Sequence, residues 1–209
     1  ATLKNLSSQQ ILSLEQRAQT WFENNAPTLQ TEGSSPTIMF AHIGQRNIKS
    51  MLFGTTIALV LISFILVFAL RSIKIGLISL IPNLIPATIT FGLWGIFVGQ
   101  VGLAVSVIAA ITLGIVVDDT IHFLSKYLHA RRKEGRNVED AIRYAFATVG
   151  TALWITSVAL IVGFSVLAFS SFKVNADLGL LTAITLFIAF LADFFFLPPL
   201  LLKFEEKDR

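Results

Sequence analysis

Long apolar runs alternate with short polar segments over most of the 209 residues, and five of these runs are long enough to cross a membrane. The hydrocarbon core of a bilayer is about 30 Å thick, so a spanning helix needs about 20 mostly apolar residues. Closed β-barrels are the only other spanning architecture, and their strands would be short and alternating. The pattern predicts an all-α integral membrane protein, a five-helix transmembrane bundle with spans at about 48–70, 75–98, 101–126, 146–169 and 178–202.

The composition excludes several other classes of protein. Hydrophobic residues make up 54% of the chain and charged residues 14%, and the mean hydropathy is +0.74. A typical soluble domain carries roughly 25% charged residues, so this chain is neither an ordinary soluble globule nor a disordered segment. The net charge of +3 lies in short clusters between apolar runs, which argues against a nucleic-acid partner. The chain contains no cysteine, so thiolate metal sites are excluded, and we expect no metal or cofactor.

Residues 1–47 are more polar than the rest of the chain. Ser7 and Gln10 fit a capping box at the start of an amphipathic helix over about 8–24, and we expect 37–43 to form a strand that enters the first span. One helix and one strand cannot bury a stable core alone. We therefore expect this segment to be the remnant of a larger extramembrane domain.

The basic residues of the loops predict the orientation. Those that follow spans one, three and five are Arg71, Lys74, Lys126, Arg131, Arg132, Lys133, Arg136, Arg143, Lys203, Lys207 and Arg209. The loops on the opposite side, 99–100 and 170–176, contain a single basic residue, Lys173. Because short basic loops stay in the cytoplasm, we expect an extracytoplasmic N-terminus and a cytoplasmic tail at 205–209.

The longest basic loop should contain a short helix over about 137–146. Asn137 is a suitable N-cap, the next turn carries acidic residues, and apolar residues follow at helical spacing. Two readings stay open. The helix lies on the membrane surface, where basic neighbours meet anionic headgroups, or it is a solvated connector.

Four ionisable residues interrupt the apolar runs: Asp118, Asp119 and His122 in span three, and Asp193 in span five. A charged side chain at the bilayer centre costs at least about 2.5–3.5 kcal/mol, so function is the default hypothesis for such residues. Asp118 and Asp119 are four and three residues before His122, so both are its neighbours on a helix, although they point about 100° apart.

Adjacent carboxylates in a low dielectric do not both ionise easily, which favours a group that takes up and releases protons. The alternative is a structural hydrogen-bond cluster. Polar contacts between membrane helices contribute only about 0.6 kcal/mol on average, so this explains the Asp118, Asp119 and His122 cluster poorly. For Asp193 both interpretations stay open. Thr148, Thr151, Thr156 and Ser157 give span four polar groups that could face these acids.

Small residues and prolines add packing signals. Glycines permit close helix approach, and we expect this at Gly92, Gly95, Gly114, Gly150 and Gly163. Pro82 and Pro86 should kink span two near its start.

The stretch from Leu113 to Phe123, Leu-Gly-Ile-Val-Val-Asp-Asp-Thr-Ile-His-Phe, resembles the GxxxDD signature of the resistance-nodulation-division (RND) superfamily. It is most similar to the branch of MMPL-type and Patched-like hydrophobe exporters. Further stretches match in the same order, at 68–72, 81–86, 156–171, 179–183 and 192–198. The resemblance covers about 48–204, and the ordered set is far more specific than GxxxDD alone.

The resemblance implies an exporter of lipids or other hydrophobic molecules, driven by the proton-motive force across a bacterial-type inner (plasma) membrane. Members have two similar halves, each with one helix, an extracytoplasmic porter domain and five further helices. This chain would be the last five helices of a half, 48–204, after a porter-domain remnant at 1–47. The proton relay would use Asp118 and Asp119, with His122 and Asp193 as further candidates. Partners would be membrane lipids, the hydrophobic substrate and the remaining half or a homologous subunit.

Other functions compete with this one. A complete transporter needs more spans than these, so we expect the chain to be the C-terminal portion of a longer exporter. A truncated, non-transporting RND-like subunit or lipid sensor in a larger complex is the alternative. An intramembrane aspartyl protease that pairs Asp193 with Asp118 or Asp119 would need a carboxylate dyad. Two lone acids are a weak signature of such a site, so we expect no enzyme.

Overall fold

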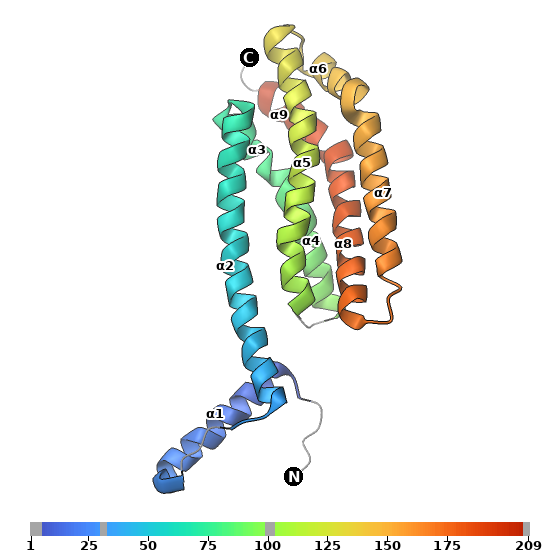
Figure 1. The fold of residues 1–209 in the computed structure, drawn as a ribbon. Coiled ribbons are helices and arrows are strands. Elements are labelled where there is room, and N and C mark those ends of the chain that lie inside the picture. Colours follow the sequence, from blue (N-terminus) through green and yellow to red (C-terminus); the bar gives the residue numbers. More distant parts are fainter. Residues whose placement is uncertain (1–5, 30–32, 99–102, 207–209) are drawn as a thin grey trace. The chain divides into compact units, whose positions relative to one another are not determined.

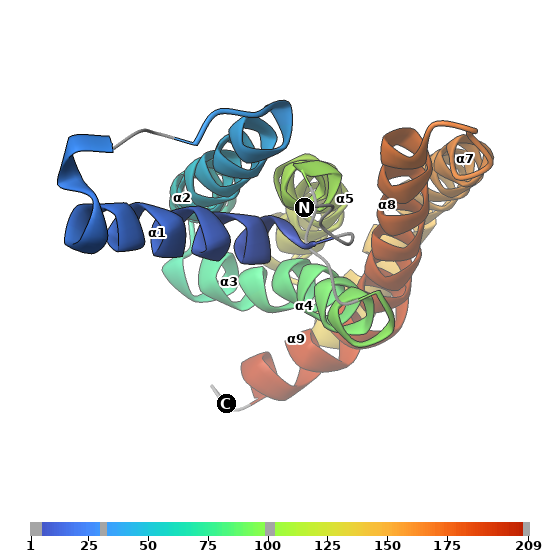
Figure 2. The same ribbon diagram turned by 90° about the horizontal axis from the view of Figure 1, so that it is seen from below.

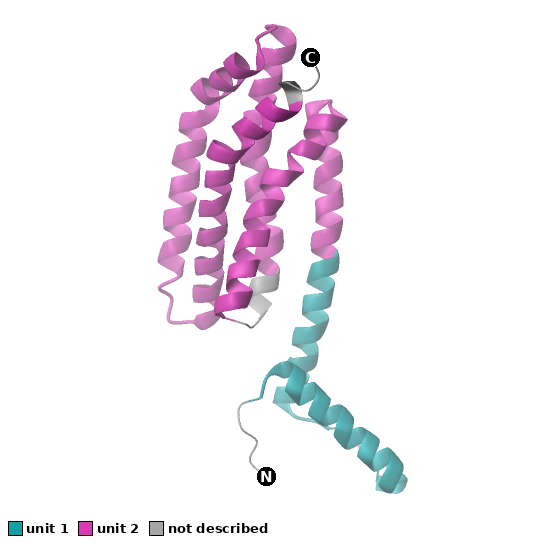
Figure 3. Cartoon of the chain, turned by 180° about the vertical axis from the view of Figure 1, so that it is seen from behind, with its two compact units in different colours: residues 1–53 teal, residues 54–209 magenta. Residues whose placement is uncertain are grey.

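A computed structural model describes residues 6–29, 33–98 and 103–206, and every regular element in these ranges is a helix (Figure 1). The chain divides into two compact units, residues 1–53 and 54–209 (Figure 3), and each is described by itself. The predicted loop at 99–100 lies outside the described residues.

The first unit contains α1 (Ser8–Asn25), the short helix η1 (Pro27–Leu29) and the beginning of α2 (Pro36–Leu70). The predicted capping box is confirmed: Ser7 Oγ accepts from Gln10 N–H, and the Gln10 side chain accepts from Ser7 N–H. A contact of 2.7 Å between His42 Nε2 and Glu15 Oε2 joins α2 to α1.

The predicted strand at 37–43 is wrong, because these residues form the first turns of α2. Ser35 acts as the N-cap, with its Oγ accepting from Ile38 N–H at 3.2 Å, and Pro36 takes the first helical position. Proline suits that position because its fixed φ is helical and no N–H is needed there. The Ser-Pro pair is therefore a helix start rather than part of a loop.

The second unit holds the rest of α2 and all later helices. These are α3 (Ile73–Ile78), α4 (Leu80–Phe97), α5 (Leu103–Lys133), α6 (Val138–Ala145), η2 (Phe146–Gly150), α7 (Thr151–Leu167), α8 (Lys173–Leu191), η3 (Ala192–Phe196) and α9 (Leu197–Glu206). Within the described ranges, five helical stretches are long and apolar enough to cross a membrane, which confirms the predicted number of spans. They are 36–70, 73–97, 107–133, 138–167 and 173–204.

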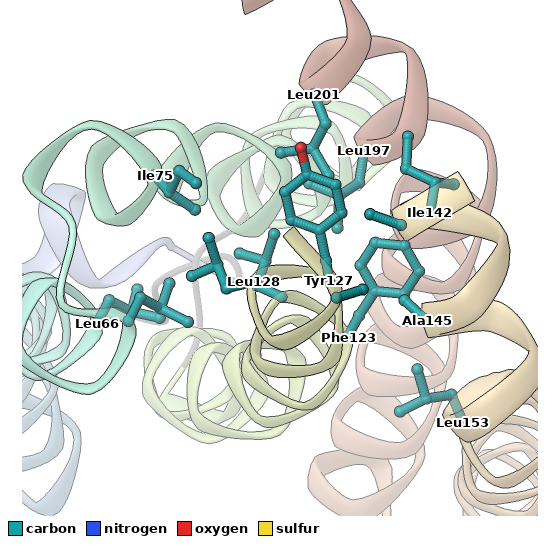
Figure 4. Packing of buried hydrophobic residues seen from close by; sticks show 14 of the residues in the cluster. Leu66, Ile75, Phe123, Tyr127, Leu128, Ile142, Ala145, Leu153, Leu197 and Leu201 are labelled. Atoms are coloured by element: carbon teal, nitrogen blue, oxygen red, sulfur yellow. The ribbon is translucent and has the colours of Figure 1, made fainter. Parts of the chain in front are cut away.

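Helix α5 occupies the middle of the second unit, with α4 and α8 packed against it (Figure 2). The largest buried cluster surrounds its C-terminal half, where Phe123 and Tyr127 lie between α6 and α9 (Figure 4). Leu197 and Leu201 contribute from α9, and Ile142 contributes from α6. We call this region the α6 end of the bundle.

The short helix α6 begins where predicted, since the Asn137 side chain accepts a hydrogen bond from Asp140 N–H at 2.8 Å. Its apolar stripe is buried in the core cluster, with Ala141, Ile142 and Ala145 as the buried residues. The helix is therefore a packed part of the bundle rather than a solvated connector.

Span two is broken at Ser79, between α3 and α4, as the prolines predicted. Pro82 has no N–H to donate to the carbonyl of Ile78, so the helical ladder is interrupted there. Ser79 is buried, and its Oγ donates to the carbonyl of Gly76 at 2.8 Å. The break brings polar groups of α4 into the bundle interior.

Close helix approach occurs at glycines other than those predicted. A Cβ on Gly179 would lie 2.6 Å from Ala168 N and 2.7 Å from Phe164 O, and Gly76 approaches the Val67 backbone similarly. By contrast, a Cβ on any of Gly92, Gly95, Gly114 and Gly163 meets no atom within 4 Å. This corrects the sequence prediction for contacts within the described chain.

The alanine variant Gly179→Ala should destabilise the protein by about 1–3 kcal/mol, because the added methyl group overpacks against the backbone of the α7–α8 connection. The matched control is Gly163→Ala in α7, where the added Cβ meets open space. Thermal unfolding of the detergent-solubilised protein measures both, and equal melting temperatures would contradict the close approach.

Candidate functional site

An open groove of about 690 Å³ runs between α5 and the chain segment formed by η2 and α7 (Figure 1 shows these helices). Its polar residues are Asp118, Asp119 and His122 from α5 and Thr156 from α7, and its other residues are apolar or glycine. The structure thus brings three of the four predicted ionisable residues together in one groove.

Asp118 and His122 form the open part of this site. His122 Nε2 lies 3.6 Å from Asp118 Oδ1, one helical turn away, and the two side chains are 62% and 71% exposed respectively. A protonated imidazole beside this carboxylate would form an ion pair, and a neutral one can receive a proton from the groove. Both side chains are therefore accessible from the groove.

Asp119 forms the inner part of the site. Its Oδ2 accepts a hydrogen bond from Ser157 Oγ of α7 at 3.1 Å, and Ser157 is buried. This confirms the expectation for Ser157, and Thr156 lies in the same groove as the acids of span three. The bond joins the two helices at the floor of the groove, so the charge of Asp119 bears directly on how α5 contacts α7.

Asp193 lies apart from the groove residues. It is 6% exposed, and its Oδ1 is 3.0 Å from Thr120 Oγ1, which is itself fully buried. Thr120 is two residues beyond Asp118, about 200° around α5, so the two side chains leave different sides of that helix. The structure therefore separates the four predicted residues into an open site and a closed one.

Sequence reasoning missed two residues at the closed site, Thr120 and Asn83. Thr120 Oγ1 lies 2.7 Å from Asn83 Oδ1 of α4, and Asn83 is also buried. An asparagine between Pro82 and Leu84 in an apolar run was the available signal, because a buried amide needs hydrogen-bond partners. Residue spacing along one helix could not show which side chain of another helix the Asn83 amide would contact.

Carboxylate and imidazole side chains can each bind and release a proton. No group of three His, Cys, Asp or Glu side chains is placed to hold a metal ion among the residues that the structure describes.

Five spanning helices with acids and a histidine in a groove between them place the chain in the class of polytopic helical membrane proteins with an intramembrane polar site. The MMPL family model matches residues 4–205, and the chain belongs to the MMPL family. It is thus a transporter-like membrane domain.

A membrane protein of Methanocaldococcus jannaschii, MJ1562, is 30% identical to the chain over 159 residues. The match covers 76% of this chain and 40% of that relative, so the chain spans less than half of the relative's length. No solved structure matches the chain.

Water access should distinguish the two sites. The chain has no native cysteine, so a single introduced thiol reports on its own position in a cysteine-free background. We expect Thr156→Cys in the groove to react with a small thiosulfonate reagent and Thr120→Cys in the closed site to stay unreacted, because a thiol reacts as its hydrated thiolate. Equal labelling rates at both positions would contradict the separation.

Proposed function

We propose that the chain is the membrane segment of a proton-motive-force-driven exporter of lipids or other hydrophobic molecules. The proton relay consists of Asp118, Asp119 and His122. The observation that supports this most is that all three side chains share one open groove between two spanning helices.

Energetic cost supports this proposal over a structural role. Two acids and a histidine in a spanning segment are expensive to insert, and the single bond from Ser157 to Asp119 offsets little of that cost. Moving one proton across a membrane releases about 2.3 kcal/mol per 100 mV, so a site that loads and releases protons has a use for these groups.

The arrangement gives each residue a distinct part in the relay. Asp118 and His122 receive the proton from the groove, since both are largely exposed there and lie 3.6 Å apart. Asp119 receives it next, because it adjoins Asp118 and is partly buried. A neutral Asp119 binds Ser157 differently from an ionised one, so proton uptake changes the contact between α5 and α7.

The open groove also supports a protein partner in the membrane. An exposed carboxylate and imidazole facing lipid are costly, so water or another protein segment must cover them. We propose that the remaining half of the transporter, or a homologous subunit, covers this face. Residues 1–47 then belong to an extracytoplasmic porter domain, and the hydrophobic substrate passes through parts that lie outside this chain.

Replacing either acid of the groove should abolish proton-coupled export. We expect Asp118→Asn and Asp119→Asn to insert normally and to lose transport, because an amide cannot load a proton. Glu139→Gln, which removes an exposed acid from α6, is the matched control and should transport normally. The measurement uses the full-length protein in vesicles with an imposed pH gradient, following a fluorescent phospholipid and the pH of the vesicle interior. Normal lipid export by both groove variants would overturn the proposal.

The orientation is tested with two further single cysteines. A membrane-impermeant thiol reagent added to intact cells should label Ser170→Cys in the α7–α8 connection and spare Glu139→Cys in α6, because the basic loops are expected to face the cytoplasm. The opposite labelling pattern would reverse the proposed orientation and place residues 1–47 inside the cell.

A further inference from the structure

We propose that Asn83, Thr120 and Asp193 form a second proton-binding site, closed to the groove, in which the Thr120 hydroxyl reverses the direction of its hydrogen bond when Asp193 gains or loses a proton. The site joins three elements, α4, α5 and η3. Its ligand is a proton, and it lies outside the groove relay of the proposed function.

The three side chains are enclosed in the bundle interior. Asn83 is 2% exposed, and Thr120 and Asp193 are buried as well. Thr120 Oγ1 lies 2.7 Å from Asn83 Oδ1 and 3.0 Å from Asp193 Oδ1, with the carbonyl of Val116 at 3.3 Å. A single hydroxyl therefore lies between an amide and a carboxyl group.

A count of protons shows that this arrangement needs one more donor. A threonine hydroxyl carries one hydrogen, so it can donate fully to only one of the three oxygens around it. When Thr120 donates to Asn83 Oδ1, the carboxyl of Asp193 must supply the hydrogen between itself and Thr120. The geometry with Asn83 Oδ1 toward Thr120 thus fits a protonated Asp193.

The ionised state of Asp193 fits the opposite orientation of the Asn83 amide. Asn83 Nδ2 is buried and makes no hydrogen bond in the present orientation, which costs about 1–3 kcal/mol for an unpaired donor. If the amide turns over, Nδ2 donates to Thr120 Oγ1 and Thr120 donates to the carboxylate of Asp193. In this step one proton passes from the Asp193 carboxyl to solvent water, and no bond between heavier atoms forms or breaks.

The charged groups around Asp193 are few. Helix α4 contains no titratable residue between Leu80 and Phe97, and the nearest in α8 and α9 are Asp177 and Lys203, far along each helix. The nearest on α5 is Asp119, next to Thr120 in sequence, with Asp118, His122 and Lys126 further away on that helix. Two ionised carboxylates this near in a poorly solvated interior repel each other, so occupancy of the closed site depends on Asp119.

The backbone around Asp193 adds a second, independent feature. Residues Ala192–Phe196 form a π-helical turn, in which Leu197 N–H donates to the carbonyl of Ala192. Pro198 and Pro199 follow, and neither can donate to the carbonyls four residues earlier. Single π-helical turns inside α-helices occur frequently at functional sites.

A chain of aromatic rings connects this turn to the groove. The ring centroid of Phe194, next to Asp193, lies 5.4 Å from that of Phe146. Phe146 is the first residue of the other π-helical segment, η2. The ring centroid of Phe146 also lies 4.8 Å from that of Phe123 in α5. Because η2 supplies Val149 to the groove, a shift of η3 has a packed route to the groove wall.

Infrared titration of the purified full-length protein tests this site directly. We expect a protonated-carboxyl band that disappears as pH rises and is missing in Asp193→Asn, and an Asn83 amide band, missing in Asn83→Leu, that changes with the same midpoint. Thr120→Val keeps the shape of the residue without its hydroxyl and should abolish the response of the amide band. Thr120→Ser keeps the hydroxyl and should restore the response.

Two results would overturn the inference: an Asp193 band that stays constant over the whole pH range in which the protein is folded, or an amide response that persists in Thr120→Val. If Asn83→Leu does not fold, the comparison of the serine and valine variants of Thr120 still decides. The outcome is separable from the proposed function, because Asp118→Asn should abolish export while the Asp193 band still titrates. Loss of that band response together with normal wild-type export would reject the closed site alone.

Discussion

Helix α5 has to bury apolar side chains and hold three consecutive polar ones at the same membrane depth, and the bundle is arranged around this requirement. Successive residues of a helix point about 100° apart, so Asp118, Asp119 and Thr120 face three different surroundings. Asp118 faces the groove, Asp119 meets Ser157 of α7, and Thr120 meets Asn83 and Asp193. Thr120 lies in the closed interior, where its polar partners have to come from α4 and η3, whereas Ser157 of α7 supplies a donor to Asp119 in the groove.

Much of this could be predicted from the sequence, because the signals lie within single helices. Hydrophobic run length indicated the five spans, the capping residues Ser7 and Asn137 indicated helix starts, and the rarity of charge in such runs indicated the site residues. The strand at 37–43 was wrong because Ser35 caps a helix and Pro36 takes its first position, so residues 37–43 continue that helix. The closed site could not be predicted, because Asn83, Thr120 and Asp193 lie on three different helical elements. The sequence of one helix does not show which residue of another helix it will contact.

The two ends of the second unit are held by different kinds of contact. At the α6 end, large side chains such as Tyr127 and Phe123 fill the space between helices, and rings from both π-helical segments meet there. At the other end, Gly179 lets the chain after α7 approach to backbone contact. Side-chain packing therefore holds the α6 end, and backbone contact holds the other end.

The open and closed sites share α5, and this sharing constrains how the helix can respond to protons. Asp119 and Thr120 are adjacent residues of α5 that contact different neighbours. Asp119 accepts a hydrogen bond from Ser157, and Thr120 contacts Asn83 and Asp193. A rotation that releases one of them displaces the other, so the two cannot be rearranged independently. A carboxyl group that becomes neutral needs a different set of donors, and this favours a different position of α5. If both sites bind protons as proposed, they act on the same helix, and a shared helix is the physical requirement for coupling between them.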